Sequence, residues 1–370
     1  MIKFKTLIYC ILVISGLIFE GFANSDISAQ NRFNRLQAGQ PFVKCLETKN
    51  NLIDQIASDN NQTIIVENSG IVRQINNSDH LQNWHIELGN KLESIPYLYE
   101  TNILLISYAK EIKNANQQTS IRQINSLTGI TDWITSLNPS EQFLMIRDSN
   151  TENITLLSDK LNIRQIEPKN GKILWSIDLK GDLGKYTSGR DFLYILTTED
   201  KLFIIRIKDG SILSETEFKS KNVSALSYIN DSLFLGNIKG VLYKFSDNTK
   251  VEKLFRTGGE VSFIKSFGSE LLVVSRDNFL YYYSTEKEKI LWKKRLSGRV
   301  ILEPVIYQDL IFTTSLVEPV IYIFNRIDGT LVNQINLGEN YYIKKIAVNE
   351  SGVNVLTTSG LLKFGVDCQD

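Results

Sequence analysis

Short apolar stretches alternate with polar turn residues along almost the whole chain after residue 40. The segments Gln142–Arg147, Ile154–Ser158, Asn162–Glu167 and Ile173–Leu179 are rich in Ile and Leu, and Asp, Asn, Ser and Gly separate them. Residues of the first kind favour β-strands, and the separators favour turns. No stretch beyond the N-terminal segment shows an apolar period of 3.6 residues. The pattern therefore predicts many short strands and no long helix.

These strands recur with a period of about forty residues. Three four-residue segments, which we call tetrads, have Arg-Gln between two aliphatic residues. In each case a Trp follows the Arg by eleven residues, and these are Trp84, Trp133 and Trp175. Weaker copies follow, and in one of them Trp292 lies eleven residues after Tyr281. The second residues of the tetrads stand at positions 73, 122, 164, 203, 243, 281, 322 and 362. The chain therefore contains eight copies of one unit, with a polar insertion at 110–120 that lengthens the second.

Glycines mark the turn before the last strand of several copies. They are Gly129, Gly171, Gly210 and Gly329, three of which follow Asn or Asp. Asn-Gly and Asp-Gly pairs suit tight hairpins because the central residues of such turns need positive φ. Each copy is therefore interpreted as four short antiparallel strands joined by turns.

Four strands repeated eight times predict a β-propeller, in which blades pack face to face around a ring. The eighth copy reaches Phe364, and too few residues follow it for a fourth strand. Residues 41–47, at the other end, are strand-like and precede the first blade. We therefore predict an all-β, eight-bladed β-propeller of four-stranded blades over residues 41–370, closed by an N-terminal strand that completes the last blade. Residues 24–40 are expected to form an N-terminal linker.

Two cysteines fall at this predicted closure. Cys45 lies in the donated strand, and Cys368 follows the third strand of the blade that the donated strand completes. In an oxidising compartment a disulfide between them is expected. Closing so long a loop contributes about 4–5 kcal/mol in the chain-entropy model. The alternative is two free thiols, with Cys45 buried and Cys368 at a frayed end.

The first 23 residues predict a secretory signal peptide. Lys3 and Lys5 precede an uncharged run from Thr6 to Phe19, and the small-residue site Gly21-Phe22-Ala23 follows. Cys10 lies inside the apolar run instead of at its end, so a lipoprotein signal is not predicted. An uncleaved membrane anchor is the alternative. We expect an exported protein, periplasmic or associated with the cell envelope, with no transmembrane segment after the signal.

Charge and composition argue against several classes of function. The chain has 41 Lys+Arg and 41 Asp+Glu, and nucleic acid or anionic lipid would favour a basic surface. His80 and His85 are the only histidines, and they lack a third metal ligand nearby in the sequence. We interpret them as turn and strand residues. No Ser-His-acid arrangement is readable, so we expect no catalytic residue, metal or cofactor.

Arg73, Arg122 and Arg164 occupy equivalent positions in the first three copies. In one interpretation they face one surface together and bind an acidic partner. In the other, their aliphatic stems cover the strands between blades. Later copies have Phe203 and Tyr243 at this position, which favours packing.

The segment Asn170-Gly171-Lys172-Ile173-Leu174-Trp175 resembles the PQQ-like, or quinoprotein-type, propeller repeat, which reads Gly-x-x-x-Trp after a turn. Ser126–Trp133 fits as well, and Glu288–Trp292 keeps the Trp with Glu in the Gly position. The resemblance implies a propeller in which the Trp docks between blades and the Gly makes the turn.

Within that superfamily, quinoprotein dehydrogenases are longer and carry adjacent cysteines, which this chain lacks. A single-domain exported propeller of this length is similar to the BamB family of scaffolds in the outer-membrane β-barrel assembly machine. The resemblance implies a non-enzymatic, monomeric periplasmic protein that binds this machine and helps deliver unfolded outer-membrane proteins. Two alternatives stay open. One is a quinone-dependent or other small-molecule enzyme or binding protein that uses the propeller channel, and the other is a cell-envelope interaction or sensor propeller.

Overall fold

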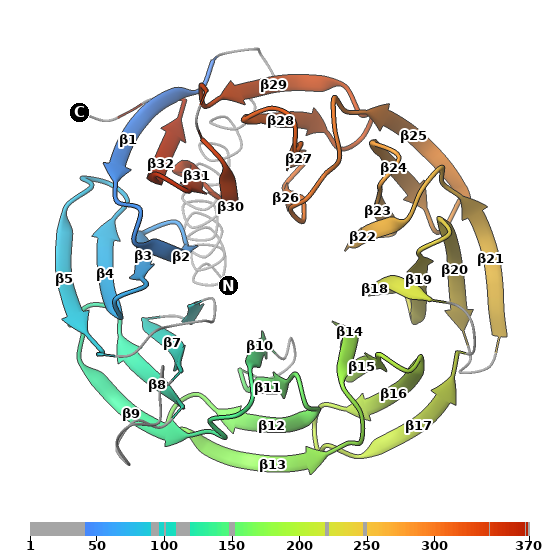
Figure 1. Ribbon diagram of the computed structural model, residues 1–370, viewed down its shortest axis with the longest axis horizontal. Coiled ribbons are helices and arrows are strands. Elements are labelled where there is room, and N and C mark those ends of the chain that lie inside the picture. Colours follow the sequence, from blue (N-terminus) through green and yellow to red (C-terminus); the bar gives the residue numbers. More distant parts are fainter. Residues whose placement is uncertain are drawn as a thin grey trace, which may run out of the picture.

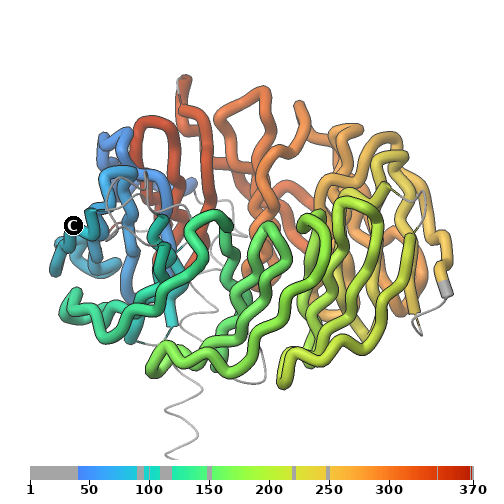
Figure 2. Tube along the Cα trace, turned by 60° about the horizontal axis from the view of Figure 1, so that its bottom comes forward, coloured from blue at the N-terminus to red at the C-terminus, as the bar shows by residue number. Residues whose placement is uncertain are grey.

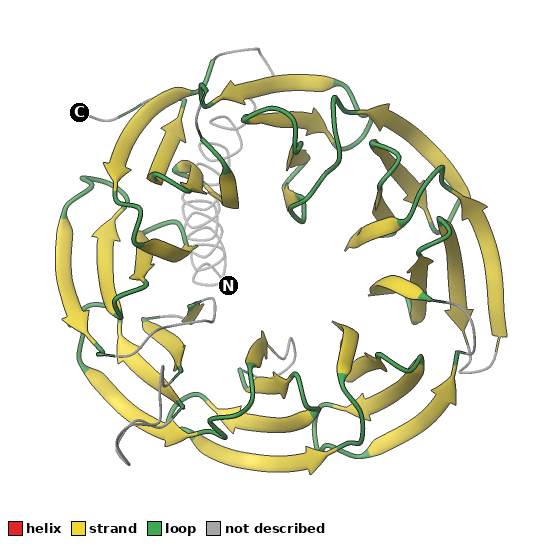
Figure 3. Cartoon of the chain, in the orientation of Figure 1, coloured by secondary structure: helices red, strands yellow, loops and turns green. Residues whose placement is uncertain are grey.

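The computed structural model describes residues 41–89, 96–99, 101–108, 119–147, 152–218, 222–246, 250–339, 341–366 and 368. The expected signal peptide (1–23) and linker (24–40) lie outside the described residues. Thirty-two strands in the described part form eight separate four-stranded sheets. These sheets stand as blades around a ring (Figure 1), and the described chain is drawn as strands and connecting loops in Figure 3. The predicted all-β, eight-bladed propeller is confirmed.

Each blade is an antiparallel meander whose strands run from the channel outward (Figure 1). Blades one to four consist of β2 (Ile53–Ser58), β3 (Gln62–Glu67), β4 (Ile71–Asn76), β5 (Gln82–Glu87); β6 (Tyr97–Tyr99), β7 (Asn102–Ser107), β8 (Ser120–Asn125), β9 (Thr131–Ser136); β10 (Phe143–Arg147), β11 (Ile154–Ser158), β12 (Asn162–Glu167), β13 (Lys172–Asp178); and β14 (Leu183–Ser188), β15 (Phe192–Thr197), β16 (Lys201–Arg206), β17 (Ile212–Glu217). Blades five to eight consist of β18 (Val223–Ile229), β19 (Ser232–Asn237), β20 (Val241–Ser246), β21 (Lys250–Arg256); β22 (Val261–Phe267), β23 (Glu270–Ser275), β24 (Phe279–Ser284), β25 (Lys289–Arg295); β26 (Val305–Tyr307), β27 (Leu310–Thr314), β28 (Val320–Asn325), β29 (Leu331–Asn336); and β30 (Ile343–Asn349), β31 (Gly352–Thr357), β32 (Gly360–Gly365), β1 (Val43–Lys49). In blade three the observed strands agree with the predicted segments to within one residue at each end.

The position of a strand within its blade determines its burial. The second strand of each blade is buried along nearly its whole length, as in β3 and β19, because neighbouring blades cover both of its faces. Such strands carry continuous apolar runs. The outer strands β9 and β17 instead alternate between half-buried and exposed residues, since only one face is covered.

The hydrophobic core is divided among the contacts between adjacent blades, which we call seams. Eight clusters of buried side chains each combine residues of two neighbouring blades, so every seam has its own core. The seam between blades eight and one, which we call the closing seam, has the fewest buried members. They are Ile53, Ile56, Ile65, Leu356 and Leu361.

Strand β1 closes the ring by pairing antiparallel with β32, from Val43 opposite Gly365 to Lys49 opposite Gly360. The blue and red ends of the described chain accordingly lie side by side in Figure 2. The predicted completion of the last blade by the N-terminal strand is confirmed. The register shifts between Lys44 and Leu46, which makes Cys45 a bulged residue.

Candidate functional site

Four seams share a contact that we call the Trp latch. Trp84, Trp133, Trp175 and Trp292 lie on the outer strands β5, β9, β13 and β25, and each indole Nε1 donates to a backbone carbonyl of the next blade. The acceptors are the carbonyls of Ser126, Pro168, Ile207 and Arg326, at 2.6, 2.7, 2.9 and 2.9 Å respectively. Three residues after these acceptors stand Gly129, Gly171, Gly210 and Gly329.

Each of these glycines lies under the indole of the preceding blade. A Cβ atom at Gly171 would come within 2.5 Å of Trp133 Cε3, and one at Gly210 within 2.7 Å of Trp175 Cε3. Both glycines also have φ of +72°, a conformation that costs other residues free energy. The Gly-x-x-x-Trp pattern therefore serves two seams, because its glycine receives one indole while its Trp reaches the next blade.

The glutamine of the tetrads has a role that was not expected from the sequence. Gln123 and Gln165 are the cross-strand partners of Trp133 and Trp175. Gln165 Oε1 accepts from Trp175 Nε1 at 3.0 Å, and Gln123 Oε1 accepts from Trp133 Nε1. In blade six Tyr282 takes this place and stacks on the indole of that blade, with ring centroids 5.0 Å apart. The constant ten-residue spacing before the Trp was the available signal.

Arg73, Arg122 and Arg164 lie in three successive seams instead of on one surface. Each arginine lies opposite a residue of the neighbouring strand, and these three partners belong to three different seam cores. In the order of the arginines, the cores lie between blades eight and one, between blades one and two, and between blades two and three. The guanidinium Nε of Arg73 pairs with Glu67 at 2.8 Å, within its own blade. That of Arg164 donates to Asn162 Oδ1 at 2.8 Å. This placement favours the packing interpretation.

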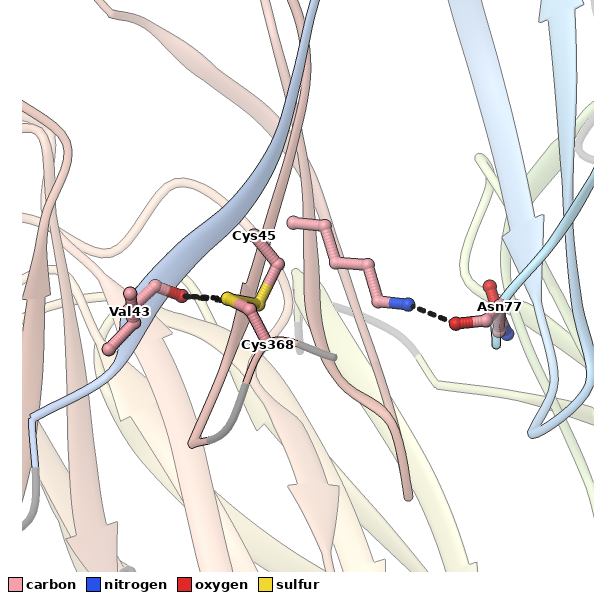
Figure 4. Close-up of a disulfide and its surroundings, with 5 residues drawn as sticks. Val43, Cys45, Asn77 and Cys368 are labelled. Atoms are coloured by element: carbon pink, nitrogen blue, oxygen red, sulfur yellow. Dashed lines mark hydrogen bonds between the residues drawn. A yellow bond between two sulfur atoms is a disulfide. The ribbon is translucent and has the colours of Figure 1, made fainter. Parts of the chain in front are cut away.

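Cys45 and Cys368 form a disulfide between the two outermost strands of blade eight, with their Cα atoms 5.2 Å apart (Figure 4). Cys45 is the bulged residue of β1, and Cys368 follows the end of β32 by three residues. In the other seven blades three to five residues of chain join the third strand to the fourth at this place. In blade eight the two strands come from opposite ends of the sequence, so the disulfide stands in place of a hairpin turn.

At the closing seam, a lysine contacts the backbone carbonyl that corresponds to the acceptor of the Trp latch in four other seams. Lys363 lies opposite Leu46 in the ladder, as Gln lies opposite Trp in blades two and three. Lys363 therefore stands at the Gln position and Leu46 at the Trp position. Its Nζ donates to the carbonyl of Asn77 at 2.9 Å, the contact drawn in Figure 4. Asn77 lies three residues before His80, which occupies the turn position of the latch glycines with φ of 61°. The amine thus contacts the carbonyl that an indole contacts elsewhere, and we call this contact the Lys latch.

Two amines at the closing seam have a lowered pKa because burial disfavours their charged form. Burial lowers the pKa of Lys363, whose residue is 4% exposed. It lowers the pKa of Lys345 to about 8, and the Lys345 Nζ donates to the carbonyl of Ile56 at 2.6 Å. Among the residues that the structure describes, neither Nζ pairs with a carboxylate. Burial, and then the charge of Lys363, lowers the pKa of His80.

Buried amides complete the polar character of the closing seam. Asn349 Nδ2 donates to Ser58 Oγ at 2.8 Å and to the Asp59 carbonyl at 2.6 Å. Asn354 Nδ2 also donates to Ser58 Oγ, at 3.2 Å. Blade eight is therefore joined to blade one by these hydrogen bonds as well as by the smallest of the seam cores, whereas the Trp latches add aromatic contact.

Exposed aliphatic side chains occupy equivalent positions on the outer strands of blades three and four. Ile173 and Leu174 on β13 are 39% and 43% exposed, and Ile212 and Leu213 on β17 are 49% and 44% exposed. We call these four residues the aliphatic band. Leu174 and Leu213 are bulged residues, and a bulge hinders edge-to-edge strand pairing. The band therefore presents side chains, which suits recognition by a protein partner.

Other kinds of site find little support in the described part of the chain. There, no three His, Cys, Asp or Glu side chains gather as metal ligands would. Nor do these residues include a helix that is long and apolar enough to cross a membrane.

One protein family matches part of the chain. Its model, described as outer membrane protein assembly factor BamB, matches residues 159–253. This match supports the resemblance to the PQQ-like repeat over about a quarter of the chain. No curated protein matches the chain.

Solved structures share the fold at low sequence identity. BamB from Moraxella catarrhalis is 13% identical with a TM-score of 0.63, over 87% of this chain and 97% of that one. The computationally designed Ika8 protein is 10% identical with a TM-score of 0.70, over 88% and 99%. The C-terminal WD40 domain of Sif2 is 12% identical with a TM-score of 0.69, over 88% and 98%. The chain is thus an eight-bladed β-propeller in which residues 159–253 match the BamB family model.

Proposed function

We propose that this protein is a non-enzymatic exported scaffold, similar to BamB, that binds partner proteins during the assembly of outer-membrane β-barrel proteins. The aliphatic band carries the proposal, because all four of its residues fall inside the segment that matches the BamB model. Apolar side chains held in water on a rigid sheet are what a protein partner buries on binding. The predicted signal peptide supports a periplasmic or envelope location.

The ring architecture suits a scaffold. Eight blades, each with its own seam core, hold the outer strands at fixed positions, so a partner meets a preorganised surface. We infer that the protein acts as a monomer, with the band as its contact to the partner and without catalytic groups or a cofactor.

Affinity purification from detergent-solubilised envelopes tests this function. The tagged wild-type chain is expected to recover subunits of the barrel-assembly machine. A variant with Ile173, Leu174, Ile212 and Leu213 each changed to Ser should recover at most about one tenth of the wild-type amount of these subunits, since the buried apolar contact is lost. A matched control changes Ile290 and Leu331 to Ser, which are 37% and 51% exposed on the outer strands of blades six and seven. Failure of the wild-type chain to recover any assembly subunit would contradict the proposal.

A further inference from the structure

We propose that redox state controls whether β1, the outer strand of blade eight, stays attached to its blade. Reduction of the Cys45–Cys368 disulfide frees β1 from β32, while the outer strands of the other seven blades stay in place. The inference rests on how β1 is attached to its blade, on what surrounds it, and on the contacts that remain when it leaves.

The covalent attachment of β1 differs from that of every other outer strand. In blades one to seven, three to five residues tie the fourth strand to the third, so the fourth strand cannot move away from its partner. Strand β1 is tied at its far end to β2 of blade one, through residues 50–52. At its Val43 end, beside β32, the disulfide is the covalent link to blade eight (Figure 4). Cutting that link removes the local tether, which lowers the effective concentration of β1 at β32.

Few side-chain contacts hold β1 in place. None of its seven residues is buried, whereas all six residues of β32 are buried. Apart from its ladder with β32, Glu47 on β1 accepts a hydrogen bond from Tyr341 OH at 2.8 Å. An edge strand with little buried apolar surface belongs to the least stable parts of a fold. The outer strands β5, β9, β13 and β17 likewise have no buried residue, but each of them keeps its hairpin connection to the third strand. Because β1 lacks that connection, we infer that without the disulfide it is the outer strand that opens at the lowest free energy.

The remaining contacts of the closing seam do not depend on β1. Lys363, Lys345 and Asn349 belong to β32 and β30, and their partners belong to blade one. They continue to hold β30–β32 against blade one when β1 departs. The opening is therefore confined to one strand and exposes the backbone edge of β32, a template for strand pairing.

The redox step needs a dithiol reductant. One thiolate of the reductant attacks a sulfur of the disulfide, the bond between Cys45 and Cys368 breaks, and a mixed disulfide forms. The second thiol of the reductant displaces the bound cysteine. The reductant leaves as a disulfide, having given two electrons and two protons, and Cys45 and Cys368 become thiols. Both cysteines are half-buried, so the bridge is accessible to a small dithiol.

Hydrogen exchange of the full chain, followed by mass spectrometry, tests the release of β1, with dithiothreitol as the reductant. On reduction, exchange at residues 43–49, and at those amides of residues 360–365 that pair with β1, should accelerate by about 100-fold or more. Exchange in β13 to β16 should change by less than about threefold. Alkylation of both cysteines verifies that the bridge was present and has been reduced.

A variant with Cys45→Ser and Cys368→Ser serves as control. Without reductant it should exchange like the reduced wild type, and dithiothreitol should not change it further. If the variant fails to fold, the reduced wild type still gives the answer. Unchanged protection of β1 after verified reduction would overturn the proposal, as would equal acceleration in all blades or two free thiols in the oxidised protein.

Discussion

At Gly171 two independent requirements fall on one residue. Its φ of +72° belongs to a region that side chains disfavour, and its missing Cβ leaves the space in which the indole of Trp133 lies. Gly89 has nearly the same φ, +69°, with no atom within 4 Å of an added Cβ. A comparison of substitutions at the two positions therefore separates the free-energy cost of the strained backbone from that of the steric clash in the seam.

We expect Gly171→Ala to lower the free energy of unfolding by about 2–4 kcal/mol, since strain and a clash add together. Gly89→Ala should cost about 1 kcal/mol, because only the backbone is strained. Urea denaturation of both variants checks this difference. Equal losses would show that the indole of Trp133 does not restrict residue 171.

Lys345 gives the closing seam a dependence on pH. Its folded-state pKa of about 8 lies below its ordinary value of 10.5, so the unfolded chain binds more protons between these two values. The free energy of unfolding should therefore rise from about pH 8 towards pH 10, while below pH 8 the cost of burying the ammonium is fully present. Lys363 acts in the same direction.

The pH prediction is checked by urea denaturation between about pH 7.5 and 9.5, for the wild type and for Lys345→Met. The rise should be smaller in the variant. Tyr281 and Tyr282, with pKa values raised to about 12, act in the opposite sense only above pH 10. They are common to both proteins and cancel in the comparison. A rise of equal size in both proteins would contradict the assignment to Lys345.

Among the elements, the outer strands differ in how they hold the next blade. Trp175 on β13 donates to both the Ile207 carbonyl and Gln165 Oε1. Trp292 on β25 donates to the Arg326 carbonyl and stacks on Tyr282. Replacing the indole of Trp175 by a phenyl ring leaves the Ile207 carbonyl and the buried Gln165 amide without their donor. A phenyl ring in place of Trp292 still has Tyr282 as its aromatic partner.

Trp175→Phe is therefore expected to reduce the free energy of unfolding by about 2–3 kcal/mol, and Trp292→Phe by about 1–2 kcal/mol. Guanidinium denaturation of the two variants measures the difference. A larger loss for Trp292→Phe would mean that stacking, and not hydrogen bonding, dominates the Trp latch.

The strands were predictable from the sequence because each blade buries the same positions, which imposes one period on the chain. The latch glycines were also predictable, since positive φ selects for glycine beside Asn or Asp. The Lys latch was not predictable. It joins Lys363 to Asn77, 286 residues apart, and Lys363 stands at the position that Gln holds in blades two and three, not at the Trp position. The three arginines gave an ambiguous signal, because a position in the repeat does not show which seam it faces.

In the whole molecule, stability depends on whether the ring is closed. Cys45→Ser should lower the free energy of unfolding by about 2–5 kcal/mol, because the unfolded chain loses the constraint of a very long loop. Urea denaturation of the variant, with dithiothreitol-treated wild type as the matched comparison, checks this. A midpoint equal to that of the oxidised wild type would show that the bridge contributes nothing.

The discontinuous last blade also has a consequence for biosynthesis. Strand β1 is made long before β32, yet it has no place in the ring until β32 exists. A chain that stops early, in any blade, leaves Cys45 without its partner and its thiol unpaired. Such a fragment differs chemically from the finished ring, so an oxidoreductase or a protease that senses free thiols can distinguish the two. The disulfide thereby records that synthesis has passed Cys368.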